Sequence, residues 1–279
     1  LMQSFIPHLI LTKLMGRLAG SENRIIKGLL IKLFMWIYRP SLEESEISEI
    51  KEFPTYNSFF TRKLKKEARP IEKSKLSIVS PVDGIIIDHG FIENDMLIQA
   101  KKHYYSVEDL LGEKVAKKSN SKQYFITIYL APTDYHRIHC PYEGYISSTK
   151  HMGKLLFSVN TKAQDNIPNL YIKNERTVMK VKNNLISYSL VSVGASIVGS
   201  IVPFWSNDAS KSRKDFITEW NKGPEEKMKE VLKGQEIAHF KMGSTVILIL
   251  NDSSKLDLHS LTTNKTVKFG TKLINLKNL

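Results

Sequence analysis

Residues 239–250 read HFKMGSTVILIL, and this stretch decides the class of fold. Its second half, 246–250, is an unbroken run of aliphatic and β-branched residues closed by Asn251 and Asp252, which is typical of a short buried β-strand. A Gly-Ser-Thr triplet precedes the strand at 243–245. On its own the triplet indicates a bend, because glycine relaxes the backbone and the hydroxyl side chains satisfy local donors.

The chain after residue 75 repeats this pattern of short β-rich runs between turn residues. One helix is expected at SVEDLL, where Ser106 is the cap and Asp109 stands at the third position. Strands outnumber helices and rarely alternate with them, which predicts an α+β fold with a mainly antiparallel or mixed sheet. The expected strands are LSIVS (76–80), GIIIDHGFI (84–92), MLIQA (96–100), YFITIYL (124–130), GYISSTK (144–150), LYIKN (170–174), TVMKVK (177–182), LISYSLVSVGASIVGSIV (185–202) and TVILIL (245–250).

The N-terminal part of the chain is expected to be helical. Residues 1–39 mix large apolar residues with six basic ones and a single acid, so they can lie in a membrane interface or pack as ordinary helices on the core. Ser41 and Glu44 form a capping box for a short helix, and a further helix is expected over 58–71. No run of about 18 uncharged apolar residues occurs, and the start resembles no cleaved secretion signal, which argues against a transmembrane protein.

Composition narrows the class of protein. The 279 residues suffice for a large core, and the net charge of +13 predicts a surface drawn to polyanions such as anionic lipid or nucleic acid. Cys140 is the single cysteine, which excludes an intramolecular disulfide and any cysteine-rich zinc site. The polar segment 206–227 is the best candidate for a surface loop.

Three motifs could carry chemistry. Asp83 lies in SPVDG, His136 and His139 in APTDYHRIHCP, and Ser244 in KMGST. Separately they can be a turn residue, packed or solvated histidines and a bend, and no further spacing supports a metal site. Together they supply an acid, a base and a hydroxyl, as an activated serine requires.

An activated serine has two possible uses here. In a serine hydrolase that combines Asp83, His139 and Ser244, the usual Gly-x-Ser-x-Gly elbow would lead into a helix, whereas Val246 stands at the second glycine position and a strand follows. Alternatively, the hydroxyl of Ser244 attacks its own backbone at Gly243. Glycine suits that step because no side chain obstructs the attack.

The sequence resembles the phosphatidylserine decarboxylases of the bacterial and mitochondrial type over nearly its whole length. Two differences from the family pattern occur, Gly153-Lys154 where the family has Pro-Gly and Met242 where it has Leu. The first difference affects the expected shape of the loop before Leu156, and the second replaces one apolar side chain by another of similar volume. The motifs that carry the resemblance are FFTRKLKKEARPI, SPVDG, QAKKHYYSVEDLLG, YLAPTDYHRIHCPYEG, LFSVN, IPNLYIKNER, VGASIVGSI and KGQEIAHFKMGSTVI.

The resemblance implies a self-processing enzyme. Ser244 would be the nucleophile, His139 the base that takes its proton, and Asp83 the carboxylate that orients His139. The ester formed at Gly243 would break by β-elimination, leaving a β chain of 243 residues and an α chain of 36 residues that begins with a covalent pyruvoyl group made from Ser244. That carbonyl would form a Schiff base with the substrate amine and accept the electrons released with CO2, so no added cofactor would be needed.

Further residues are assigned by the resemblance alone. His136 would protonate the carbanion near neutral pH, and strand alternation requires a bend to bring it to the same site as His139. His103 also matches a family position, but no role for it follows from its chemistry. Cys140 is expected to be a small buried packing residue rather than a nucleophile. The residues expected to line the substrate pocket are Phe157, Ser158, Val159 and Asn160.

The function implied is the conversion of phosphatidylserine to phosphatidylethanolamine and CO2. The division expected is a membrane-associating helical region over 1–56 and a catalytic domain over 57–279. The protein would be a peripheral membrane homodimer on the cytoplasmic face of a bacterial inner membrane, with an anionic membrane surface as partner, and no nucleic acid or metal. The competing hypotheses are the serine hydrolase and a basic membrane-binding or nucleic-acid-binding module.

Overall fold

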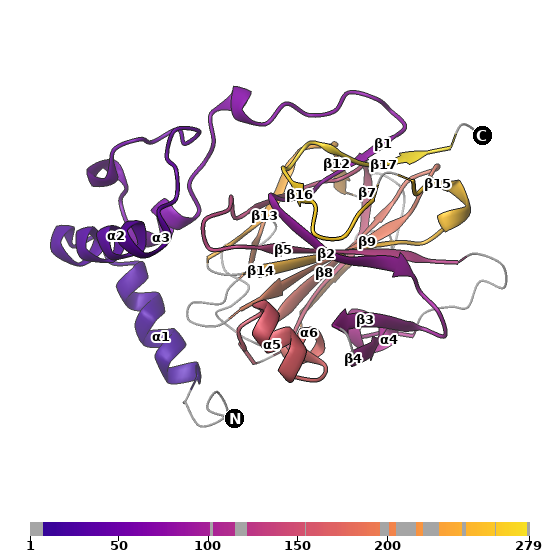
Figure 1. The fold of residues 1–279 in the computed structure, drawn as a ribbon, viewed down its shortest axis with the longest axis horizontal. Helices are drawn as coiled ribbons and strands as arrows, with labels where there is room; N and C mark the ends of the chain where they lie inside the picture. The colour runs from indigo at the N-terminus through magenta and orange to yellow at the C-terminus, as the bar shows by residue number, and fades with distance from the viewer. Residues whose placement is uncertain are drawn as a thin grey trace.

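The computed structural model of the protein describes residues 8–100, 103–114, 122–153, 155–195, 201–204, 216–219, 229–241, 244–259 and 261–277. Its centre is a nine-stranded sheet in the order β11-β7-β8-β9-β14-β5-β2-β16, with β12 also paired to β7 (Figure 1). The strand ladders of the described residues are all antiparallel, so the α+β prediction is confirmed. The strands of this sheet are β2 (Gly84–Phe91), β5 (Tyr124–Leu130), β7 (Gly144–Met152), β8 (Arg176–Lys182), β9 (Tyr188–Gly194), β11 (Phe216–Glu219), β12 (Lys229–Val231), β14 (Ser244–Leu250) and β16 (Thr266–Val267).

The predicted strand of the opening stretch is β14, and it lies in the middle of the large sheet. It pairs along its whole length with β5 on one side and with β9 on the other. Ser244 at its start faces Leu130 of β5 and Gly194 of β9. All seven residues of β14 are buried, which explains why the sequence shows a continuous apolar run instead of an alternating one.

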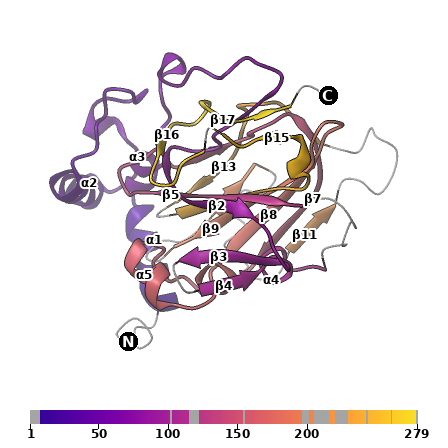
Figure 2. The same cartoon turned by 45° about the vertical axis from the view of Figure 1, so that its right-hand side comes forward.

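Alternation along β14 gives the large sheet two apolar faces. The first face carries Val246, Leu248 and Leu250, and the second carries Ile247 and Ile249. The first is covered by two small sheets, β1-β17-β15 and β10-β13-β6, and the second by the β3-β4 hairpin and three short helices (Figure 2). These covering elements are β1 (Ser77–Val79), β3 (Met96–Ala100), β4 (His103–Ser106), β6 (Arg137–His139), β10 (Ile201–Pro203), β13 (Glu236–Phe240), β15 (Leu256–Asp257), β17 (Lys272–Leu276), α4 (Val107–Leu111), α5 (Thr161–Asn166) and α6 (Leu170–Lys173).

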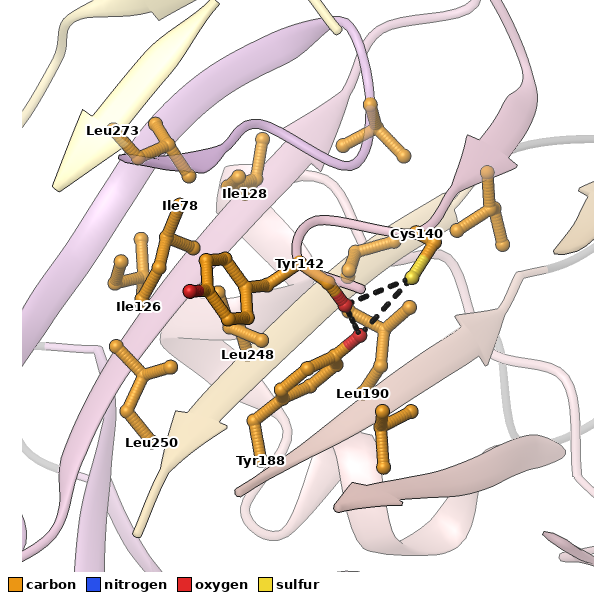
Figure 3. Close-up of a cluster of buried hydrophobic side chains, with 14 of the residues drawn as sticks. Ile78, Ile126, Ile128, Cys140, Tyr142, Tyr188, Leu190, Leu248, Leu250 and Leu273 are labelled. Atoms are coloured by element: carbon orange, nitrogen blue, oxygen red, sulfur yellow. Dashed lines mark hydrogen bonds between the residues drawn. The ribbon is translucent and has the colours of Figure 1, made fainter. Parts of the chain in front are cut away.

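Cys140 lies in the core on the first face, with two tyrosines around it (Figure 3). Its thiol donates to the carbonyl of Tyr142 at 3.0 Å and lies 3.2 Å from the hydroxyl of Tyr188. Burial raises the pKa of the thiol to about 11, so the nucleophilic thiolate is scarce at neutral pH. The prediction of a packing residue is confirmed.

The N-terminal helices form a separate apolar cluster beside the β core (Figure 1). Helix α1 (His8–Ala19) leads into α2 (Arg24–Tyr38), which the side chain of Asn23 caps, and α3 (Tyr56–Phe60) packs against α2. Within the described residues, no helix is long and apolar enough to cross a membrane.

Several local predictions are wrong. Residues 170–173 form α6 and not a strand, because Leu170 and Tyr171 are buried by a single helical turn. The helix expected over 58–71 ends at Phe60 and is followed only by the 3₁₀ turn Lys66–Ala68.

Two others concern polar segments. The segment around Ser41 and Glu44 forms a turn in which Glu44 binds basic side chains instead of capping a helix. The loop expected over 206–227 contains β11, which pairs with β7, and its remaining residues lie outside the described ones. In contrast, α4 begins where predicted, with the Ser106 side chain accepting from the amide of Asp109.

Candidate active site

Ser244 is the first residue of β14 and is fully buried. Strand alternation places its side chain on the first face of the large sheet, the face that β6 and β13 cover. Its hydroxyl has no hydrogen-bond partner in the described part of the chain. A buried hydroxyl without a partner is costly, so it indicates a functional group rather than a structural one. Gly243, the other half of the expected cleavage site, lies outside the described residues, as does Met242.

Asp83 is buried in the turn between β1 and β2, and a guanidinium holds it. Arg69 donates from Nε at 3.1 Å and from Nη2 at 2.5 Å, and the backbone amide of Phe269 donates at 2.8 Å. The same Arg69 also contacts Glu44 at 2.8 Å. The carboxylate therefore accepts charge-assisted hydrogen bonds that fix it in place.

His139 ends β6, and both of its ring nitrogens have partners. Nδ1 lies 2.8 Å from the carbonyl of Gly234, which fixes the proton on Nδ1, and Nε2 accepts from the hydroxyl of Tyr135 at 3.1 Å. The ring stacks on Phe269 with 3.7 Å between centroids. Burial lowers the pKa of His139, so the imidazole is neutral at pH 7 and Nε2 is its basic atom.

The expected pairing of Asp83 with His139 is indirect in this structure. No hydrogen bond joins the two side chains among the described residues; Phe269 connects them, with its amide on Asp83 and its ring on His139. The sequence could not supply this link, because Phe269 belongs to the C-terminal segment, which has no local pattern that points to the site.

His136 precedes β6 and is fully buried. Its Nδ1 lies 2.7 Å from the carbonyl of Asp134, while Nε2 is buried with no partner in the described part of the chain. The ring contacts Phe60 of α3, with 4.2 Å between centroids. Burial, helped by the charge of Arg62, lowers the pKa of His136 to about 3. The resting imidazole is therefore neutral, and its expected role in protonating the carbanion stays a prediction.

Strand β13 pairs with β6, which carries His139, and the chain continues from β13 to Ser244. In the β6–β13 pair, Glu236 lies opposite His139, and the amide of Phe240 donates to the carbonyl of His136. Strand β13 thus runs from His139 toward His136, and the chain reaches Ser244 four residues after Phe240. Strand β6 begins at Arg137, so His136 lies just before it. Strand alternation therefore does not apply between His136 and His139, and the change of backbone direction expected between them occurs where β6 begins.

The residues expected to line the pocket follow Leu155 in a loop that reaches the start of β14. The Asn174 side chain accepts from the amide of Phe157 and donates to the carbonyls of Phe157 and Gly194, the β9 partner of Ser244. Val159 is buried, and Asn160 caps α5. Ser158 is half-buried.

A left-handed glycine precedes this loop. Gly153 has φ +86°, and a Cβ there would come within 2.3 Å of the Asn174 carbonyl oxygen. The departure from the family pattern therefore coincides with a turn that only glycine fits, while Lys154 lies outside the described residues. His103, the other matched histidine, contacts the carbonyl of Asp165 at 3.1 Å and is not among the residues around Ser244.

Sequence reasoning missed several groups that surround the candidate residues. Arg62 and Arg69 stand in the motif FFTRKLKKEARPI, so a signal was present, but the segment was interpreted as a helix. Asn174 stands in NLYIKNER, which was interpreted as a strand. In each case a wrong local structure hid a polar side chain that reaches the site.

Comparisons with known proteins agree with this geometry. A family model described as "Phosphatidylserine decarboxylase" matches residues 56–275, and a second, described as "PSD", matches residues 1–39. The chain is 39% identical over 251 residues to the phosphatidylserine decarboxylase proenzyme of Coxiella burnetii (strain Dugway 5J108-111), covering 89% of this chain and 87% of the relative.

Two further proenzymes of the same name are similar. That of Erwinia tasmaniensis is 37% identical over 271 residues, covering 96% of this chain and 91% of the relative. That of Vibrio parahaemolyticus is 38% identical over 262 residues, covering 92% and 91%. With a family model over most of its length and relatives of this identity and coverage, the chain belongs to the phosphatidylserine decarboxylase family.

Proposed function

We propose that this protein is a phosphatidylserine decarboxylase that matures by cutting its own chain before Ser244. The observation that carries the proposal is the Ser244 hydroxyl, which is fully buried without a hydrogen bond in the described residues and heads the central strand. Family membership gives this hydroxyl its chemistry, since the relatives are named as proenzymes. A hydrolase serine would need access to a substrate, whereas a self-cleaving serine needs only its own backbone.

The cleavage is written as an acyl shift followed by an elimination. Ser244 Oγ attacks the carbonyl carbon of Gly243, the peptide C–N bond breaks, and an ester forms. Removal of the Cα proton of Ser244 then breaks its Cβ–O bond, so that Gly243 leaves as a carboxylate. Water releases ammonia from the residue left at 244, which becomes the pyruvoyl group.

The proton transfers of the cleavage are assigned to His139 with the support of Asp83. His139 Nε2 is the basic atom of a neutral imidazole, and it accepts the Oγ proton once the hydroxyl of Tyr135 gives way. Arg69 and the backbone amide of Phe269 hold the Asp83 carboxylate in place, while the Phe269 ring stacks on His139. The role of Asp83 is therefore to orient the histidine through the ring of Phe269 and to favour its charged form.

The pyruvoyl group formed from Ser244 and the imidazole of His136 would carry out the decarboxylation. A pyruvoyl ketone at position 244 supplies an electrophile for the substrate amine and accepts the electron pair left by CO2. His136 Nε2 is unprotonated and has no partner among the residues that the structure describes, so it takes a proton from the substrate ammonium and returns it to the carbon that lost CO2. Because burial lowers the pKa of His136, the neutral ring is a weak base, but once protonated it is a strong acid toward the carbon that lost CO2.

Helix α2 supplies the surface for the membrane. It buries Ile31 and Phe34, while its other side exposes a stripe at helical spacing. We retain the division into a membrane-associating region over 1–56 and a catalytic domain over 57–279, a homodimer, and the cytoplasmic face of the inner membrane as the location. The exposed stripe is Ile25, Leu29, Leu33, Trp36 and Ile37.

The deciding experiment is the intact mass of the purified protein beside a Ser244→Ala variant, followed by CO2 release from phosphatidylserine vesicles. Two chains of 243 and 36 residues, the smaller lighter by one ammonia than a Ser-terminated peptide, are expected from the parent protein alone. Only the cut protein should release CO2. A single chain in both samples, with reaction toward serine-directed phosphonates, would favour the hydrolase instead.

A further inference from the structure

Arg62 is a buried cation with hydrogen-bonding capacity left over. It follows α3, and only 6% of its surface is exposed. Nη2 donates to the carbonyl of Thr133 at 3.0 Å, but Nε and Nη1 are buried without a partner in the described part of the chain. Unpaired buried guanidinium donors are costly, which indicates that their partner is a group that the chain itself does not provide.

The acids close to Arg62 already have other partners. Asp83 accepts from Arg69 and from the amide of Phe269, and Asp134 accepts from the amide of Ala131 at 2.7 Å. Both carboxylates stabilise the charge of Arg62 at a distance, yet neither forms a hydrogen bond with it. The two unpaired donors therefore remain available for an external anion.

Arg62 lies between two parts of the structure, the apolar cluster of α2 and the end of the large sheet where Ser244 begins β14. Phe60, two residues earlier, belongs to the apolar cluster of α2 and also contacts the ring of His136. Thr133, which accepts from Arg62, lies three residues after Leu130, the β5 partner of Ser244. The guanidinium thus stands between the helix with the exposed apolar stripe and the end of the sheet where Ser244 begins β14.

A buried nitrogen of His136 lies at the same junction as these Arg62 donors. His136 Nε2 and the two Arg62 nitrogens Nε and Nη1 are all buried and lack partners within the described ranges, and the charge of Arg62 acts on the imidazole. A lipid whose acyl chains remain in a membrane beside α2 would present its headgroup between these two surfaces. Its anionic part must then pass close to Arg62.

We infer that Arg62 binds the phosphodiester of the phospholipid headgroup and so positions the serine moiety next to His136 and residue 244; this rests on the proposed function. Guanidinium groups suit phosphate oxygens. The substrate carboxylate is the other possible anion, but pairing it with arginine would stabilise the ground state that must lose CO2. The phosphodiester keeps its charge throughout the reaction, so binding it does not raise the barrier.

The test compares Arg62→Gln and Arg62→Lys with a matched control, Lys182→Gln, which removes an exposed charge at the end of β8. The substrate is dihexanoyl phosphatidylserine, which is soluble, so that membrane docking does not enter. Each sample is first checked for chain cleavage by intact mass. Arg62→Gln should raise KM about 10- to 100-fold, because hydrogen bonds to a charged group are lost, and should change kcat less than threefold. The Lys variant should be intermediate and the control unchanged.

Inhibition of the unsubstituted enzyme separates the two anions without relying on a variant. Glycerophosphoethanolamine, which has the phosphodiester and no carboxylate, should compete with the substrate, whereas serine, which has the carboxylate alone, should not. Competition by serine but not by glycerophosphoethanolamine would overturn the inference, as would an unchanged KM in cleaved Arg62→Gln. If the unsubstituted protein is uncut or releases no CO2, the proposed function itself fails, which is a separate result.

Discussion

Acidification from pH 7 to pH 5 should destabilise the protein through His136. In the unfolded chain its imidazole takes a proton below about pH 6.5, whereas in the folded protein burial lowers the pKa to about 3. The unfolded state therefore binds more protons between these two values. The stabilisation by the neutral histidine is complete above pH 6.5 and is lost as the pH falls toward 3.

The size of this effect follows from the distance between the two pKa values. Each pH unit below 6.5 removes about 1.4 kcal/mol, so His136 alone accounts for about 2 kcal/mol at pH 5. His239, whose pKa burial lowers to about 4, contributes in the same direction. The effect of His136 is isolated by taking the difference between a protein with this residue and one without it.

The assay is urea unfolding at pH 7 and pH 5 in a Ser244→Ala background, which keeps the chain in one piece. With His136 present, the free energy of unfolding should fall by about 2 kcal/mol more than with His136→Asn, because asparagine does not titrate. Packing differences at Phe60 cancel, since each variant is compared with itself at two pH values. An equal fall in both proteins would refute the reasoning, because it would mean that the folded imidazole titrates normally.

Three other predictions concern stability and reactivity. Leu248→Ala removes a fully buried side chain from β14 and should lower the free energy of unfolding by about 2–5 kcal/mol in the same urea assay. Asp83→Asn should cost about 3–5 kcal/mol, because it leaves the buried Arg69 poorly paired, while Glu44→Gln, at the exposed side of the same arginine, should cost less than about 1 kcal/mol; equal losses would contradict this assignment. Cys140 should react with a thiol reagent at pH 8 only after denaturation, given its burial and a pKa of about 11, and rapid labelling of the native protein would contradict the core described here.

The strands could be predicted from the sequence because buried sheet leaves a local signature. The apolar runs of β5 and β14 give strands close to the expected bounds, whereas the single strand expected over 185–202 is wrong, because β9 ends at Gly194 and Ile201–Pro203 form the separate strand β10. The run at 170–174 gives a helix instead, since a short apolar segment can be buried equally well by either structure and only its neighbours decide. The strands β6, β13 and β17 were not predicted; β6, with three residues, is too short to show a period.

The candidate site was predictable only as far as its residues stand in recognisable motifs. Asp83, the two histidines and Ser244 come from such motifs, and their roles remain predictions. Their contacts come from elsewhere: the partner that stacks on His139 is Phe269, more than 100 residues later in the chain. Contacts over such separations depend on the completed sheet, so no local pattern contains them.

The central place of β14 has a consequence for the order of events in the life of the protein. If the chain is cut before Ser244 as proposed, the small chain keeps β14, which is paired over seven residues with each neighbouring strand, and it keeps β15 and β17 on the first face. Its release would divide the large sheet in two. The proposed cleavage would also need the finished sheet, because only there is Ser244 buried between β5 and β9. In that case the cut would also check the folding of the chain, because a misfolded chain would stay whole and would not acquire a reactive carbonyl.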